Sequence, residues 1–217
     1  MKVVIAGGHG QIAQHIERQL AARGDEAVGL VRNPAHVADL EALGATAVVL
    51  DLESASVADL AAHLTDADAV VFAAGAGPGS GAARKDTVDR GAAALLADAA
   101  EAAGVARYVM ISAIGAATGG QGRDDVFGVY LDAKKAADDD LMSRDLGWTV
   151  LRPGGLTDDG PTGQVTLSAD VATGSIPRED VAAVVVAVLD EPGTARTVAN
   201  LVSGPTPVAG AVADLAR

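Results

Sequence analysis

The feature that most constrains this chain is a short apolar run that breaks into glycines and continues as an amphipathic helix. Val3–Ala6 is apolar, Gly7–Gly10 holds three glycines, and apolar side chains then recur at Ile12, Ile16 and Leu20. This order predicts a buried strand, a tight turn and a helix. Free backbone N–H groups and the positive end of the dipole at such a helix start form a site for phosphate.

The glycine spacing makes this prediction more specific. The motif G-x-x-G-x-x-A begins at Gly7, and G-x-G-x-x-A, the dinucleotide fingerprint, begins at Gly8. Gly7 and Gly10 allow a close approach of the backbone because they lack Cβ, and Gln11 and Ile12 open the helix that would face the phosphates. We therefore expect Gly7, Gly10, Gln11 and Ile12 to contact a dinucleotide; a glycine turn that binds nothing is the alternative.

Composition narrows the class of protein. The 217 residues suit one domain, 1–217, and no apolar run reaches membrane-spanning length. Because the N-terminus also lacks a signal-peptide layout, we expect a cytoplasmic protein without membrane contact. The net charge of −13 argues against nucleic acid as a partner, and the absence of cysteine excludes thiol catalysis and disulfides.

Apolar runs alternate with helical patterns along the whole chain. This alternation predicts an α/β fold, a Rossmann-type doubly wound parallel sheet with helices on both faces. A small substrate-side portion is expected within 153–217, where 153–164 is predicted to be a loop. The predicted strands are 3–6, 26–31, 46–50, 69–73, 108–112, 148–151, 164–167 and 197–202. After the first helix, which carries Ile12, Ile16 and Leu20, the predicted helices are 34–43, 56–64, 86–103, 129–144, 178–189 and 207–216. Ligands bind such sheets across the carboxyl ends of the strands.

The residue after the second strand bears on the choice of cofactor. NAD-binding proteins usually have an acidic side chain there, which binds the ribose hydroxyls, whereas this chain has Arg32. A guanidinium suits a 2′-phosphate, so NADP (NADPH) is favoured over NAD, with Asn33 as a helper. The alternative for Arg32 is a solvated cation at a turn, and His9 is interpreted as an ordinary turn residue.

Two further segments are predicted to line the cofactor. Asp51 and Leu52 follow the third strand, where a carboxylate can accept a hydrogen bond from adenine; a helix-leading acid is the alternative. The small residues Ala73, Ala74 and Gly75 follow the fourth strand and suit a ribose and nicotinamide, unless they form only a flexible loop.

Tyr130 and Lys134 are the candidate catalytic pair. Four residues apart on a predicted helix, they project from one face. A lysine ammonium lowers the pKa of a nearby phenol, which favours proton exchange near neutrality. The alternative is an exposed helix pair. The run Asp138–Asp140 is interpreted as a solvated face, so no metal site is expected.

Together these motifs resemble the short-chain dehydrogenase/reductase superfamily, and more narrowly its atypical, NmrA-like and NAD(P)-binding members of the epimerase or reductase type. The resemblance also includes Trp-Thr-Val-Leu-Arg-Pro-Gly-Gly and Val-Asp89-Arg-Gly. It implies Tyr130 as proton donor or acceptor, Lys134 as ribose anchor and Ser112 as carbonyl orienter. Ala113 and Asp89 depart from the superfamily pattern, in which a hydroxyl residue and an asparagine are common.

These observations favour an NADP(H)-dependent oxidoreductase acting on a small carbonyl, quinone or similar acceptor. A non-catalytic NADP(H) sensor is the alternative. A nucleotide-sugar epimerase or dehydratase ranks last, because only about sixty-five residues follow Pro153. The oligomeric state is left open, with a homodimer as one option.

Overall fold

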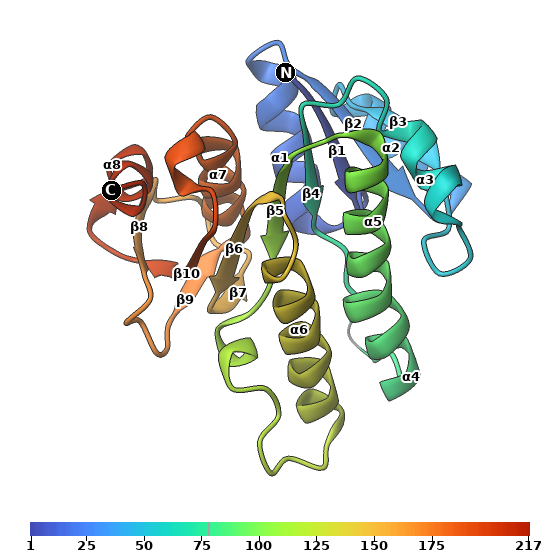
Figure 1. Cartoon of the computed structure of the whole chain (residues 1–217). Helices are drawn as coiled ribbons and strands as arrows, with labels where there is room; N and C mark the ends of the chain where they lie inside the picture. Colours follow the sequence, from blue (N-terminus) through green and yellow to red (C-terminus); the bar gives the residue numbers. More distant parts are fainter. Residues whose placement is uncertain (78) are drawn as a thin grey trace.

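The computed structural model describes residues 1–77 and 79–217, and its main element is a nine-stranded sheet (Figure 1). Pro78, within the predicted loop 74–81, lies outside the described residues. From one edge the strands are β3 (Thr46–Val49), β2 (Glu26–Val31), β1 (Lys2–Ala6), β4 (Ala69–Phe72), β5 (Arg107–Ile111), β6 (Gly147–Pro153), β10 (Thr197–Ser203), β8 (Gln164–Ser168) and β11 (Thr206–Pro207).

The pairing from β3 to β10 is parallel throughout, whereas β8 is antiparallel to both of its neighbours. The order from β3 to β6 is that of a Rossmann sheet, which confirms the predicted doubly wound class. The strand order reverses between β1 and β4, where Ala6 is in register with Phe72. A ligand crevice is therefore expected over the carboxyl ends of these two strands.

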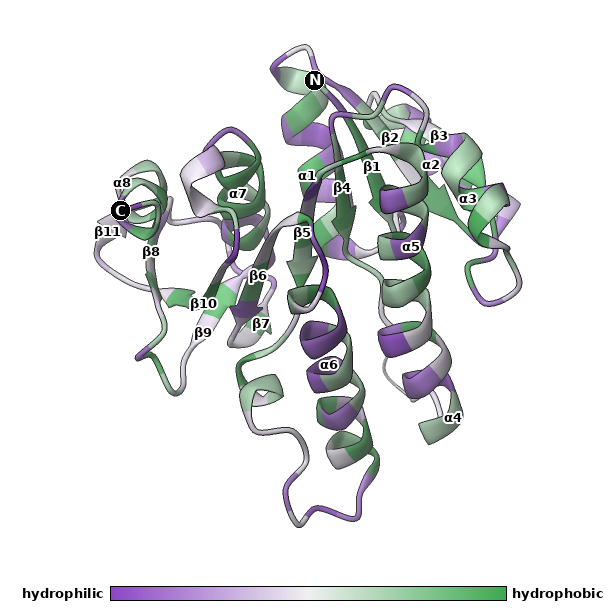
Figure 2. Cartoon of the chain, viewed as in Figure 1, coloured by the Kyte–Doolittle hydropathy of each residue, from purple (hydrophilic) through white to green (hydrophobic). Residues whose placement is uncertain are grey.

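Each central strand divides its side chains between two cores, because successive residues point to opposite faces of a sheet. Val3 and Ile5 of β1 belong to one core, and Val4 and Ala6 belong to the other. Figure 2 shows the strands of the sheet mostly in the hydrophobic colour, whereas the helices carry many hydrophilic patches. The first core is covered by α1 (Gln11–Ala22), α7 (Arg178–Leu189) and α8 (Val208–Leu215), and the second by α3 (Val57–His63), α5 (Ala93–Ala103) and α6 (Val126–Met142).

The helix predicted over 86–103 is not a uniform α-helix. The structure has α4 (Ala82–Arg84), wider π-helical turns in η2 (Lys85–Ala92), and then α5. Gly91 weakens α-helix formation in this segment, and the wider turns leave the adjacent residues Val88 and Asp89 both buried. Such turns are frequent at functional sites.

Other differences from the predicted elements are small. The helix predicted over 34–43 divides into η1 (Pro34–His36) and α2 (Val37–Ala42), and α6 begins at Val126, where the Asp125 side chain accepts a hydrogen bond from the Gly128 N–H. The predicted loop 153–164 contains β7 (Gly155–Thr157), which pairs with β9 (Ser175–Pro177). Two short helical turns are η3 (Ile114–Ala117) and η4 (Pro192–Thr194).

Within residues 1–77 and 79–217, no helix combines the length and apolarity needed to cross a bilayer.

Candidate functional site

A continuous cleft follows the carboxyl edge of the sheet. It consists of three cavities that share Ala74 and Gly75: an outer cavity of about 170 Å³ near β3, a turn cavity of about 280 Å³ at the glycine turn, and an apolar cavity of about 800 Å³ near β5 and β6. The cleft therefore lies at the reversal of strand order, where open α/β sheets bind ligands.

The glycine turn has the geometry of a phosphate site. Gly7 has φ +84°, and a Cβ there would lie 2.6 Å from Ala74 Cα. Gly10 is the N-cap of α1, and its N–H donates to Gly7 O at 2.8 Å. No side chain of the described part of the chain caps α1. The helix start with Gln11 and Ile12 therefore suits an anionic ligand, as a dinucleotide pyrophosphate would be.

Arg32, the residue predicted for the adenosine end, lines both the turn cavity and the outer cavity. Its Nη1 lies 3.1 Å from Glu53 Oε2, and Nη2 of Arg84 lies 2.8 Å from the same oxygen. Thr87 Oγ1 donates to Glu53 Oε1 at 2.7 Å. The hydrogen bonds from Arg84 and Thr87 lower the pKa of Glu53. Two guanidinium groups thus share one carboxylate.

The other residues predicted for the adenosine end lie nearby. Asp51 and Leu52 line the outer cavity, where Asp51 Oδ1 accepts from the Glu53 N–H at 3.1 Å. Asn33 lines the turn cavity and caps η1 through a 3.0 Å hydrogen bond from the Ala35 N–H. His9 also lines the turn cavity; its ring stacks on His36 with centroids 3.5 Å apart.

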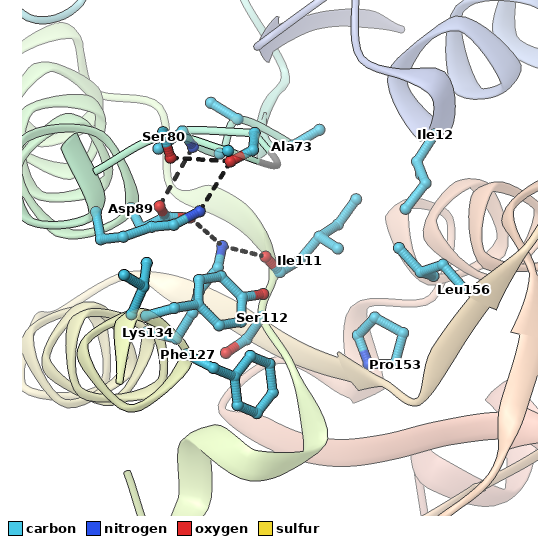
Figure 3. Close-up of a pocket in the computed structure, with 18 of the residues that line it drawn as sticks. Ile12, Ala73, Ser80, Asp89, Ile111, Ser112, Phe127, Lys134, Pro153 and Leu156 are labelled. Atoms are coloured by element: carbon cyan, nitrogen blue, oxygen red, sulfur yellow. Dashed lines mark hydrogen bonds and ion pairs between the residues drawn. The ribbon is translucent and has the colours of Figure 1, made fainter. Parts of the chain in front are cut away.

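The residues predicted for the nicotinamide end gather around the apolar cavity. Ala73, Ala74 and Gly75 from the loop after β4 line it together with Ile12 of α1. The same cavity is also lined by Ser112, which follows β5, and by Tyr130 and Lys134 of α6. Figure 3 shows Ser112 and Lys134 on the side of the cavity away from Ile12. The interpretation of Tyr130 and Lys134 as an exposed pair is wrong, because Lys134 is buried.

Lys134 is held by two groups. Its Nζ donates to Ile111 O at 3.1 Å and lies 3.6 Å from Asp89 Oδ1. Burial lowers the pKa of the Lys134 ammonium, while the nearby Asp89 raises it. Asp89 is itself buried, and its Oδ2 accepts from the Ala76 N–H at 3.2 Å. Asp89 therefore links the loop after β4 to α6.

The environment of Tyr130 differs from the expectation. Burial, reinforced by Asp89 and Asp138, raises the pKa of the Tyr130 phenol to about 12. The prediction that Lys134 lowers this pKa is wrong for the protein without ligand, because desolvation and two carboxylates dominate. The phenol is consequently protonated at neutral pH, the state required of a proton donor.

The hydroxyl group of Ser112 belongs to a buried hydrogen-bond network. Its Oγ donates to Asp138 Oδ2 at 2.9 Å, and Arg152 Nε donates to the same oxygen at 2.9 Å. Asp138 has no exposed surface, so its interpretation as part of a solvated face is wrong. It lies four residues after Lys134, on the helix face that packs on the sheet. Burial raises the pKa of Asp138.

Sequence reasoning missed Glu53, Arg84 and Lys85, which line the cleft and lie outside any recognisable motif. It also missed Thr87 and Asp138, which hold Glu53 and Ser112 by hydrogen bonds. The i, i+4, i+8 spacing of Tyr130, Lys134 and Asp138 was the available signal for the last of these.

A glycine turn at a helix start, a cleft across the strand ends and a Tyr–Lys pair beside it define a Rossmann-type nucleotide-binding protein. A family described as NAD(P)H-binding matches residues 7–192. The chain belongs to this NAD(P)H-binding family, which supports a nicotinamide cofactor and confirms the predicted recognition at that level.

Several relatives match along nearly their whole length. "Uncharacterized sugar epimerase YhfK" of Bacillus subtilis is 37% identical, over 99% of this chain and 100% of the relative. "UPF0659 protein YMR090W" of Saccharomyces cerevisiae is 33% identical, over 96% of each chain. Among solved structures, "Putative NAD-dependent epimerase/dehydratase" from Bacillus halodurans is 36% identical, with a TM-score of 0.92 over 99% of this chain and 100% of that one.

Proposed function

We propose that the protein is an NADP(H)-dependent oxidoreductase of the atypical short-chain dehydrogenase/reductase type that acts on a carbonyl or quinone. The observation that carries this proposal is the placement of Tyr130 and Lys134 in one cavity with the small residues that follow β4. A protonated phenol and a buried ammonium beside a nicotinamide site are the groups that carbonyl reduction requires.

When bound, the cofactor would supply or accept a hydride. In the reducing direction Tyr130 donates its phenolic proton to the carbonyl oxygen of the substrate. Lys134, whose ammonium lies beside the same cavity, binds a hydroxyl of the nicotinamide ribose. The α1 N-terminus and the glycine turn hold the pyrophosphate.

The preference for NADP over NAD is assigned to two guanidinium groups. Arg32 and Arg84 already hold one anion, the carboxylate of Glu53, at 3.1 Å and 2.8 Å. A 2′-phosphate carries more charge than a carboxylate and pairs well with guanidinium groups. We therefore assign Arg32 and Arg84 as its ligands, with Glu53 displaced from them on binding.

The experiment is NADPH oxidation by the purified protein against a panel of aldehydes, ketones and quinones. Tyr130→Phe keeps the ring and removes the proton, so it should lower kcat by about 10²- to 10⁴-fold. Lys135→Met serves as a matched control on the same helix, since Lys135 pairs with Asp139 away from the cavity. An unchanged rate in Tyr130→Phe would contradict the proposed role of Tyr130.

Each of two alternative functions is favoured by one observation. The names of two relatives contain the word epimerase, which favours sugar chemistry. The hydroxyl of Ser112 is held by Asp138, which favours a cofactor sensor without a carbonyl-orienting serine. Epimerisation of a nucleotide sugar without net NADPH consumption would support the first, and tight NADPH binding without turnover on any acceptor would support the second.

A further inference from the structure

The apolar cavity extends well beyond the residues assigned to the cofactor. At about 800 Å³ it is the largest of the three, and it lies within the range of small-molecule sites. Its apolar side chains come from four separate parts of the chain: Ile12, Ile111, Val126, Phe127, Pro153 and Leu156. Figure 3 shows Phe127 and Leu156 on different sides of the open space, on separate elements.

Large apolar side chains are exposed at the mouth of this cavity. In the part of the chain that the structure describes, the exposed large hydrophobic residues are Met1, Val49, Val126, Phe127 and Leu156. The last three all line the apolar cavity. Phe127 is 52% exposed. A cluster of exposed apolar surface at a cleft marks a site that a ligand covers.

The aromatic side chains of the cavity form a pair. The rings of Phe127 and Tyr130 have centroids 5.7 Å apart and are tilted by 33°. Aromatic residues make up only 2% of the sequence, so two rings on one wall of a cavity represent a local concentration. Flat conjugated molecules pack favourably on such rings.

Most of the polar side chains that line the cavity already have one hydrogen-bond partner in the protein. Ser112 Oγ donates to Asp138, Lys134 Nζ donates to Ile111 O, and Lys85 Nζ donates to Gly77 O at 3.0 Å. Among the described residues no hydrogen bond involves Tyr130 Oη, which stays available for one oxygen of a substrate. A polyhydroxylated sugar would find few free side-chain partners in this cavity, and each buried hydroxyl left without one costs about 1–3 kcal/mol.

We infer that the substrate is a flat, largely apolar carbonyl compound, such as an aromatic quinone, and is not a nucleotide sugar. This inference rests on the proposed function. The ring of the substrate lies between Phe127 and Leu156, with one carbonyl oxygen toward Tyr130. A hydride from NADPH and one proton, delivered through Tyr130, reduce the quinone to the hydroquinone and leave NADP⁺, so electrons and atoms balance.

The test is a titration of the full-length protein, with and without saturating NADP⁺, using phenanthrenequinone and UDP-glucose as probes. Quinone binding should be at least about tenfold tighter than that of UDP-glucose. Phe127→Ser should weaken quinone binding about tenfold and leave NADP⁺ binding unchanged. Val49→Ser, which removes an exposed valine of β3 that does not line the cavity, is the matched control and should change neither.

The outcomes separate this inference from the proposed function. Tighter binding of UDP-glucose than of the quinone, or a Phe127→Ser protein that binds the quinone like the wild type, would overturn the apolar substrate. Failure of NADP⁺ to bind would overturn the proposed function instead. The quinone titration without nucleotide would still decide whether the cavity accepts the flat ring.

Discussion

The hydroxyl of Ser112 donates its hydrogen bond to Asp138, 2.9 Å away, and not to a group in the apolar cavity. Asp138 in turn accepts from Arg152 and belongs to the helix face that also carries Tyr130 and Lys134. The serine after β5 is therefore part of a buried polar network beneath the site. This arrangement separates the role of Ser112 from that of Tyr130 and leads to a first prediction.

Ser112→Ala should lower the free energy of unfolding measurably and should lower kcat only slightly. It removes a hydrogen bond to a buried carboxylate, which costs about 1–3 kcal/mol in the free energy of unfolding. Its loss of kcat should be clearly smaller than that of Tyr130→Phe. Urea unfolding and NADPH-oxidation assays of both variants provide the comparison. A Ser112→Ala protein as inactive as Tyr130→Phe would instead assign the serine to the substrate carbonyl.

The high pKa of Tyr130 predicts an asymmetry between the two directions of reaction. At a pKa of about 12 the phenol is protonated around neutrality and ready to donate a proton. Alcohol oxidation requires the phenolate, whose fraction rises about tenfold per pH unit below the pKa. The rate of oxidation should therefore climb with pH while the rate of reduction stays nearly flat. Parallel pH profiles in both directions would contradict this assignment.

Glu17 of α1 predicts a pH dependence of stability. Its carboxyl group is fully buried, and neither oxygen has a hydrogen-bond partner among the described residues. Desolvation raises the pKa of Glu17 from 4.5 to about 8. The folded protein therefore keeps a proton that the unfolded chain releases, so the contribution of Glu17 to stability is greatest below pH 4.5 and declines as the pH rises to about 8.

Glu17→Gln tests this prediction, because the amide is neutral at every pH. Each pKa unit corresponds to about 1.4 kcal/mol. As the pH rises from 4.5 to about 8, the free energy of unfolding of the variant should therefore gain several kcal/mol relative to that of the wild type. Denaturant unfolding at a series of pH values measures the difference. A constant difference between the two proteins from acid to mildly alkaline pH would show that Glu17 has an ordinary pKa.

Gly7 and Gly24 offer a matched pair for the glycine turn. Both have positive φ, +84° and +85°, but a Cβ at Gly7 would lie 2.6 Å from Ala74 Cα, whereas none of the described atoms lies within 4 Å at Gly24. Gly24→Ala should cost about 1–2 kcal/mol of backbone strain. Gly7→Ala should cost distinctly more and weaken nucleotide binding. Equal losses of stability would mean that the loop after β4 shifts to accommodate the added methyl group and that the contact with Ala74 costs nothing.

Much of the fold follows directly from the sequence. The apolar runs and helical periods predicted every strand from β1 to β6, and β2 and α7 have the predicted bounds. The strands β7, β9 and β11 have only two or three residues each, too few for an alternating pattern. Their pairing depends on tertiary contacts, which local sequence does not encode.

The site was predicted less completely than the fold. Motifs located the glycine turn, Arg32 and the Tyr130/Lys134 pair, because these groups have fixed spacings along strand ends and helices. Glu53 and Arg84 meet across 31 residues of chain, so only the folded structure brings them together. Asp138 was misread because three consecutive aspartates look like a solvated run, although adjacent helical residues point in different directions.

The central claim is that this cleft binds NADP(H) through Arg32 and Arg84. The most direct measurement is the Kd of NADPH and of NADH, by titration calorimetry, for the wild type, Arg32→Ala, Arg84→Ala and Glu53→Gln, with the exposed Arg18→Ala as control. NADPH should bind at least about tenfold tighter than NADH. Either cleft arginine variant should reduce that ratio and Glu53→Gln should increase it, whereas the control should leave it unchanged. Equal or tighter binding of NADH by the wild type would contradict the account.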